Sequence, residues 1–94
     1  MADSVAVAVE RRGEGWVGEV DVRQAGASTH HTVVVSRSDL ARWGRGDSDA
    51  DVEDLVRRSF AFLLEREPAT SVLRRFELSV IQRYFPEYDQ QLKP

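Results

Sequence analysis

The sequence predicts an α+β domain in which a three-stranded antiparallel meander is covered by helices. Apolar and polar residues alternate in the first third of the chain, as in half-buried strands. Further along, apolar residues recur at spacings of three and four, as in amphipathic helices. Short connections between the strands favour an antiparallel order, because a parallel pair requires a long crossover. The expected strands span about residues 4–10, 15–23 and 29–35.

Each predicted strand has one apolar face. Val5, Val7 and Val9 alternate with alanine and glutamate in the first strand, and the segment Gly13-Glu-Gly15 then supplies a turn. The second and third strands repeat the alternation, with valine on one side and mostly polar residues on the other. One face of the meander must therefore be covered.

Two helices are expected directly after the strands. The sequence Ser36-Arg-Ser-Asp39 matches a capping box and predicts a short helix over residues 37–43. The main helix is expected over about residues 49–66, with Ser48 or Asp49 as its N-cap and an apolar stripe facing the sheet.

Prolines divide the remainder of the chain into short segments. Pro68 ends the main helix, because the residue before a proline is pushed out of helical geometry. Further short helices are expected over residues 70–76 and 79–85, the second ended by Pro86. The polar residues from about 88 onward are expected to fray.

Composition indicates one soluble domain covering residues 1–94. The chain is 41% hydrophobic and 31% charged, which is ordinary for a globular protein. It has no cysteine, no apolar run near the roughly 18 residues of a membrane span and no signal-peptide pattern, so we expect a cytoplasmic protein without a membrane partner. A net charge of −3 makes a nucleic-acid partner unexpected.

The two histidines do not predict a metal site. Neighbouring residues of a strand point to opposite faces, so His30 and His31 cannot chelate one ion together in regular geometry. His31 shares a face with Val33 and Val35 and is expected at the edge of the core with a hydrogen-bonded ring, whereas His30 is expected to be exposed. An enzyme or ligand binder built around His31 would need a pocket that reaches its ring.

No other motif predicts catalysis or cofactor binding. Asp47-x-Asp49-x-Asp51 resembles the opening of a calcium loop, but Val52 and Arg58 occupy the positions that require glycine and glutamate. The serines stand where helix caps are expected. We therefore predict no catalytic, cofactor-binding or metal-binding residue and no small-molecule substrate.

The aromatic residues are numerous for so small a domain. Most must lie in the core, but Phe62 falls off the main stripe of its helix, and Phe85 and Tyr88 flank a proline near the end of the chain. If two or more of these side chains remain exposed on one side, they form a patch suited to self-association or to a partner protein. They are the predicted partner surface.

The C-terminal half resembles a family of small uncharacterised bacterial proteins. The resemblance is carried by Ser59-Phe-Ala-Phe-Leu-Leu-Glu-Arg-Glu-Pro68, Ser71-Val-Leu-Arg-Arg-Phe76 and Tyr84-Phe-Pro-Glu-Tyr88, and more weakly by His31-Thr-Val-Val-Val35. It implies a bacterial source, and it transfers no catalytic residue because the family carries no assigned activity. A meander followed by a helix is also similar in architecture to the HicB-type antitoxins, small domains that neutralise a toxin.

Two functions from different classes follow as expectations. The first is a non-enzymatic cytoplasmic protein–protein interaction module, binding a second copy of itself as a homodimer or another protein. The alternative is an antitoxin-like or regulatory protein that acts on a toxin or on nucleic acid, which the arginine pairs and the compact form favour.

Overall fold

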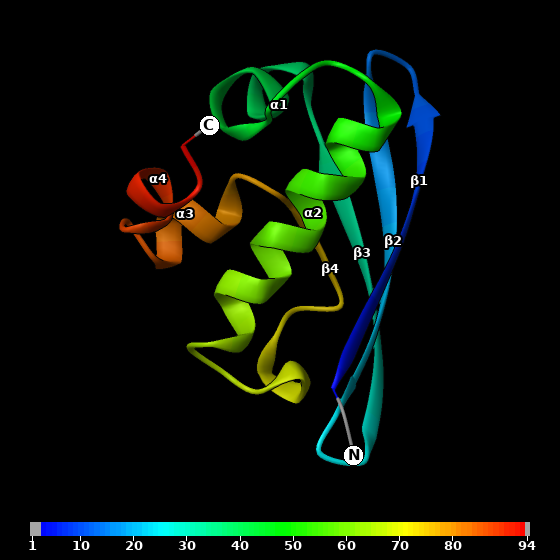
Figure 1. The fold of residues 1–94 in the computed structure, drawn as a ribbon, viewed down its shortest axis with the longest axis vertical. Coiled ribbons are helices and arrows are strands. Elements are labelled where there is room, and N and C mark those ends of the chain that lie inside the picture. The colour runs from blue at the N-terminus through cyan, green and yellow to red at the C-terminus, as the bar shows by residue number, and fades with distance from the viewer. Residues whose placement is uncertain (1–2, 94) are drawn as a thin grey trace.

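The computed structural model describes residues 3–93 and consists of one sheet with helices on one of its faces (Figure 1). The three predicted strands are present as an antiparallel meander in the spatial order β1-β2-β3, and a fourth strand continues the sheet beyond β3. The predicted α+β class is confirmed. The meander strands are β1 (Ser4–Arg12), β2 (Gly15–Gln24) and β3 (Ala27–Val35).

Both connections within the meander are two-residue turns. Gly13, with a φ of +58°, lies in the turn between β1 and β2. Ala25 and Gly26 join β2 to β3 with φ values of +53° and +82°, and two consecutive positive values fit a turn whose twist matches that of the strands. These tight turns fix the register, and the register places Val20, Val22, Val33 and Val35 on one buried face.

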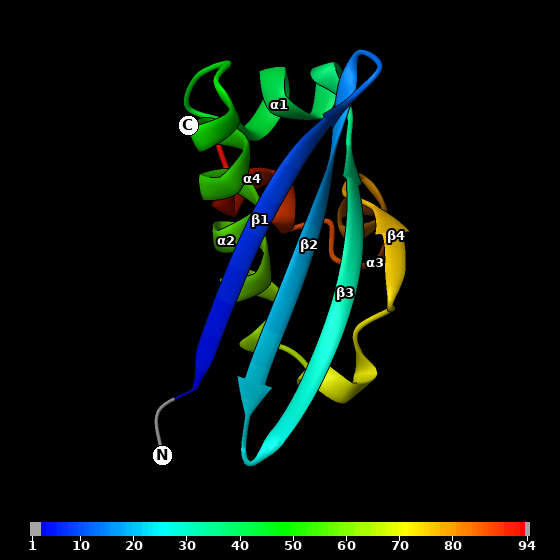
Figure 2. The ribbon, with the colours of Figure 1, turned by 90° about the vertical axis from the view of Figure 1, so that its right-hand side faces the viewer.

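The predicted helix over residues 70–76 is wrong. Ala69–Ser71 form a single 3-10 turn, η1, and Arg75–Glu77 form β4, which pairs in parallel with β3 (Figure 2). The backbone N–H of Thr32 donates to the carbonyl of Arg74 at 2.7 Å, which holds the segment extended. In this extended conformation Phe76 points inward, and its ring centroid lies 6.2 Å from that of Phe60. Packing against β3 therefore overrides the helical spacing of the apolar residues.

The two helices predicted directly after the strands are present, and each begins at a capping box. Ser36 and Ser48 each accept a hydrogen bond from the backbone N–H three residues later, and the acid at that position bonds back to the serine N–H. These boxes begin α1 (Arg37–Trp43) and α2 (Asp49–Leu64), so α2 ends slightly before the predicted boundary.

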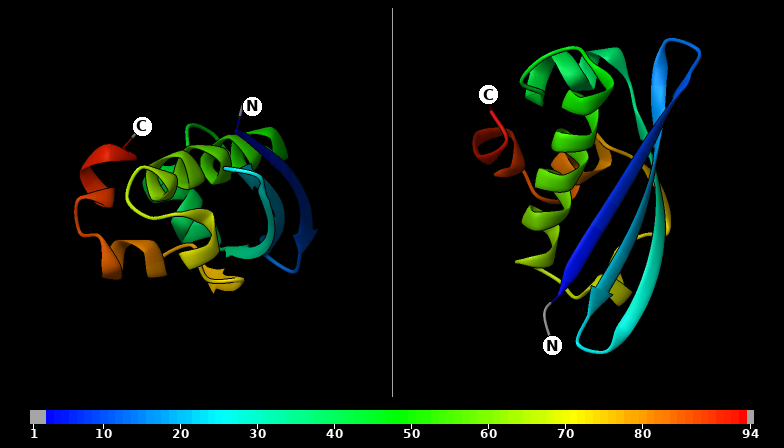
Figure 3. Two further views of the ribbon diagram at one scale, coloured as in Figure 1. Left: turned by 90° about the horizontal axis from the view of Figure 1, so that it is seen from below. Right: turned by 45° about the vertical axis from the view of Figure 1, so that its right-hand side comes forward.

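Helix α2 lies between the sheet and the C-terminal segment (Figure 3). On its sheet side, Phe60 packs against the ring of His31 at a centroid distance of 5.3 Å. On the adjacent side, Ser59 and Phe62 contact Tyr88, which begins the last helix. The C-terminal segment comprises α3 (Val80–Tyr84) and α4 (Tyr88–Gln91), and it covers a part of α2 that the sheet leaves free.

The expectation that the tail frays from about residue 88 is wrong for residues 88–92. Tyr88 is fully buried and Leu92 is 3% exposed. The Tyr88 phenol lies 2.7 Å from Ser59 Oγ, whose own proton is donated to the carbonyl of Leu55. The phenol must therefore be the donor to Ser59, because a serine hydroxyl has a single proton to give. Burial, the largest influence, raises the pKa of Tyr88.

Side chains of α4 also contact Trp43, the last residue of α1. The indole N–H of Trp43 donates to Asp89 at 2.9 Å, and the rings of Trp43 and Tyr88 meet edge to face with centroids 5.1 Å apart. Within residues 3–93, no helix is both long enough and apolar enough to cross a bilayer.

We predict that Tyr88→Ala lowers the free energy of unfolding by about 3–5 kcal/mol, as expected for deleting a buried aromatic side chain. Tyr88→Phe removes only the phenol donor to Ser59, so a loss of about 1 kcal/mol is expected. Urea unfolding followed by circular dichroism measures both values. Gln90→Ala, an exposed change in the same helix, serves as the control and should stay within about 0.5 kcal/mol of the parent protein.

Candidate interaction surface

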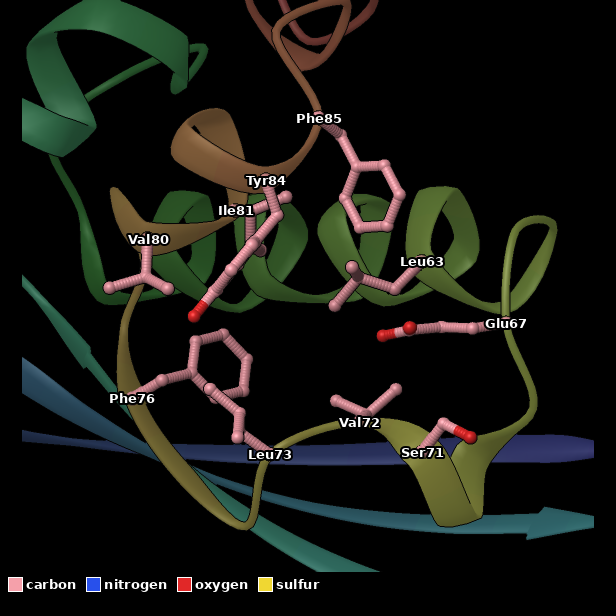
Figure 4. Close-up of a pocket in the computed structure, with 10 residues that line it drawn as sticks. All are labelled: Leu63, Glu67, Ser71, Val72, Leu73, Phe76, Val80, Ile81, Tyr84 and Phe85. Carbon is pink, nitrogen blue, oxygen red and sulfur yellow. The ribbon is translucent and has the colours of Figure 1, made fainter.

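An apolar groove opens between α3 and the segment that joins η1 to β4 (Figure 4). Its volume is about 180 Å³. Two large side chains on it face solvent, since Tyr84 is 69% exposed and Leu73 is 51% exposed. The groove is lined by Leu63, Glu67, Ser71, Val72, Leu73, Phe76, Val80, Ile81, Tyr84 and Phe85.

The two exposed side chains owe their positions to the local backbone. In the extended segment before β4, Val72 turns inward and Leu73, the next residue, turns outward. In α3, Ile81 is buried and Phe85 is half-buried one turn later, while Tyr84 lies beside this stripe and projects outward. The groove is therefore formed by the extended segment before β4, the five-residue helix α3 and the C-terminal end of α2.

One charged side chain lines the groove. Glu67 follows α2, and Figure 4 shows its carboxylate directed toward the groove from the end near Ser71. No ion pair involves Glu67 within residues 3–93, whereas the nearby Arg66 pairs with Glu87 at 3.2 Å. A basic group entering the groove would thus find an unpaired carboxylate at one end.

The predicted partner surface is not exposed as expected. Phe62 is 3% exposed, Tyr88 is fully buried, and Phe85 is half-buried. The three residues pack edge to face on one another, with Phe62 in contact with both of the others at centroid distances of 6.0 and 5.3 Å. The guanidinium of Arg66 lies 3.6 Å from the Phe62 ring and covers it. Of the three, Phe85 also reaches the groove.

Sequence reasoning therefore missed the two residues that stand out from the groove. The helices predicted over residues 70–76 and 79–85 did not single out Leu73 or Tyr84, and the first of these helices does not form. A strand-like alternation could have indicated that Leu73 points outward. Val72, Phe76 and Leu78 occupy even positions and are buried, whereas the odd positions between residues 73 and 77 are exposed. Tyr84 carried no comparable signal.

His31 is a core residue rather than a candidate base. It is 1% exposed, and its ring nitrogens lie 2.8 Å from the Leu73 carbonyl and 2.9 Å from Thr29 Oγ1. The groove lining does not include His31. Its role is to tie β3 to the segment that leads into β4, since the bond to Leu73 spans 42 positions of sequence.

The other histidine belongs to a charged cluster on the open face of the sheet. His30 Nε2 lies 2.7 Å from Glu19 Oε1 and Nδ1 lies 2.8 Å from Asp21 Oδ1. An ionised carboxylate only accepts hydrogen bonds, so both contacts are hydrogen bonds when the ring is an imidazolium that donates from both nitrogens. Glu19 also accepts a hydrogen bond from Thr32 at 3.0 Å.

These contacts shift two pKa values in opposite directions. Hydrogen bonds from His30 to Asp21, and then to Glu19, raise the pKa of His30 above its ordinary 6.5. The hydrogen bond from His30, followed by that from Thr32, lowers the pKa of Glu19. All three side chains of the cluster are about half or more exposed, so the cluster is a solvated ion-pair network on a flat surface.

Among the described residues, no group of three or more histidines, cysteines or carboxylates is placed so that it could hold a metal ion. Two of the three acids that resemble a calcium loop have other partners. Asp51 bonds to Ser48 in the capping box, and Asp49 accepts hydrogen bonds from Trp16 at 2.9 Å and Arg11 at 3.3 Å. These bonds lower the pKa of Asp49, with Trp16 the larger cause.

Comparison with protein families, with curated proteins and with solved structures finds no match to this chain. A functional assignment therefore rests on the geometry of the groove and of the sheet.

We predict that nuclear magnetic resonance titration gives His30 a pKa above 6.5 and that Asp21→Asn lowers it, because this change removes the strongest acceptor of the imidazolium. The contribution of His30 to stability is full below its unfolded pKa and is lost as pH rises through the raised folded value. Glu14→Gln, in the distant β1–β2 turn, is the control and should leave the pKa of His30 unchanged. An unshifted pKa in the parent protein would show that the cluster does not persist in solution.

Proposed function

We propose that this protein is a non-enzymatic cytoplasmic protein–protein interaction module whose apolar groove binds a segment of a partner protein. The observation that carries the proposal is the exposure of Tyr84 and Leu73 at a groove with an apolar lining. Exposed tyrosine beside apolar side chains is characteristic of binding surfaces, because the ring contributes a large contact area while its hydroxyl remains hydrated.

The lining indicates the chemistry of the segment that would bind. The groove, at about 180 Å³, is large enough for one or two aliphatic side chains rather than for an extended ligand. The unpaired carboxylate of Glu67 at its end favours a lysine or arginine next to the apolar anchor. The expected partner segment therefore combines an apolar anchor with a neighbouring basic residue.

The same geometry argues against catalysis in the groove. Its titratable lining residues within residues 3–93 are Glu67 and Tyr84, and neither bonds to a nucleophile or to an orienting group. A nucleophile needs a base within hydrogen-bond reach. The hydroxyl of Ser71 lines the groove and has no such bond to a histidine or carboxylate in the described chain.

A toxin would be one such partner in the antitoxin-like alternative, and it would use the same groove. Direct nucleic-acid binding is less well supported, because members of two arginine pairs are committed to ion pairs: Arg11 with Asp49 and Arg58 with Asp54. Retention of the protein on DNA that falls steeply with added salt would favour the nucleic-acid alternative.

We predict that selection from a displayed random-peptide library enriches peptides with an aliphatic or aromatic anchor beside lysine or arginine. The double variant Leu73→Ser/Tyr84→Ser should bind the selected peptides at least tenfold more weakly, a loss of about 1.4 kcal/mol or more. Glu67→Gln should reduce the preference for the basic residue while retaining the apolar anchor.

Arg83→Ser is the matched control, because Arg83 is exposed on the same helix and does not line the groove. It should bind the selected peptides like the parent protein. The proposal fails if no peptide family is enriched, or if the groove variants and the parent protein bind the enriched peptides equally.

A further inference from the structure

The two edges of the sheet are built differently. The β4 edge is only three residues long, and its exposed side chains, Arg75 and Glu77, are charged. The β1 edge runs for nine residues, Ser4–Arg12, and has β2 as its single neighbouring strand. Figure 2 shows β1 at the margin of the sheet, with no further strand beside it. Short length and charge are common ways of preventing edge-to-edge pairing, so only the β4 edge is protected in this manner.

Within the strand itself, β1 lacks charge, proline and bulges along most of its length, although α2 lies over its helix-facing side (Figure 2). The six residues from Ser4 to Val9 carry no charge and no proline. Each residue of β1 from Ser4 to Arg12 pairs in unbroken register with one residue of β2, so the strand contains no bulge. The backbone groups that point away from β2 are consequently presented in a regular row.

We propose that β1 pairs antiparallel with β1 of a second copy of this chain and joins the two sheets into one of eight strands. The dyad of such a dimer is perpendicular to the sheet, so the helices of both copies lie on the same face. The interface goes beyond the proposed function, because it does not use the groove, which lies near the β4 edge.

Side-chain complementarity selects one register, in which Val7 lies opposite Val7 of the second copy. Val5 then faces Val9, and Ala6 faces Ala8, so every central pair is apolar. Asp3 and Arg11, which differ in charge, then lie opposite each other at each end, and Arg11 also keeps its ion pair with Asp49. A register in which Ala8 lies opposite Ala8 of the second copy would instead place Val5 opposite Arg11. It would also place Asp3 opposite Gly13 of the β1–β2 turn.

The helix side of β1 supplies apolar surface for this interface. Val5, Val7 and Val9 are only half-buried, although they pack against the core beneath α2. Pairing with a second β1 covers their outer sides and adds apolar burial to the backbone hydrogen bonds. On the open face, the small side chains of Ala6 and Ala8 permit the strands to approach without steric conflict.

Sedimentation equilibrium over a micromolar concentration series is the first test, and the unmodified protein should be a dimer. Ala6→Lys/Ala8→Lys places like charges opposite each other twice and should raise the dissociation constant at least tenfold. Ala6→Lys/Ala8→Glu alters the same two exposed positions but places opposite charges together, so this matched control should remain a dimer. Circular dichroism should show the same fold for both.

Cysteine cross-linking tests the register directly, since the chain has no cysteine of its own. In the proposed register, the two copies of residue 7 lie directly opposite each other. Their Cα atoms are about 4.5–5.5 Å apart, so Val7→Cys should form a disulfide between the two copies. The control, Ala8→Cys, places the corresponding backbones about 8 Å apart along the diagonal, which is too far for a disulfide. Mild oxidation should therefore yield a covalent dimer for Val7→Cys and a monomer for Ala8→Cys on denaturing gels.

A monomer at every concentration would overturn the inference, as would a dimer that survives Ala6→Lys/Ala8→Lys and gives no cross-link through Val7→Cys. A cross-link through Ala8→Cys in place of Val7→Cys would overturn the proposed register. None of these results bears on peptide binding by the groove, which the Leu73→Ser/Tyr84→Ser variant tests separately.

Discussion

The structure depends on the burial of α2 from two adjacent directions. One side of the helix rests on the sheet through Val56, whose methyl group lies close to Gly18, and through Phe60. The neighbouring side is closed by the C-terminal segment, where Ser59 and Tyr88 form a buried hydrogen bond. A helix in a domain of this size gains most of its stability from such contacts rather than from intrinsic propensity. The short helices α3 and α4 are held in place by the same contacts.

This arrangement decides which apolar residues are left for recognition. The cluster of Phe62, Phe85 and Tyr88 is used to attach the C-terminal segment to α2, with Arg66 covering its outer side. Attaching that segment creates the groove, because α3 stands beside the extended chain that enters β4. At the other edge of the sheet, β1 has β2 as its single neighbouring strand, and α2 lies over its helix-facing side (Figure 2). Core packing and the two candidate surfaces are therefore consequences of one arrangement.

Local signals in the sequence predicted the meander and the first two helices well. Alternating valines and tight turns act over a few residues, and the capping boxes at Ser36 and Ser48 each involve a serine and the acid three positions later. The segment from residue 70 onward was predicted less well. Its conformation is set by β3, through the bonds of His31 to Leu73 and of Thr32 to Arg74, and such distant partners leave no periodic mark on the segment itself.

The sequence by itself determined the α+β class and the strand order of the meander, because both follow from periodicity and turn chemistry. Only the tertiary structure decided that Tyr88 is core and that Tyr84 and Leu73 are exposed. The physical reason is that exposure depends on what packs over a side chain. For these residues the covering elements are α2, α3 and β4, whose relative positions are fixed by contacts between residues far apart in the chain.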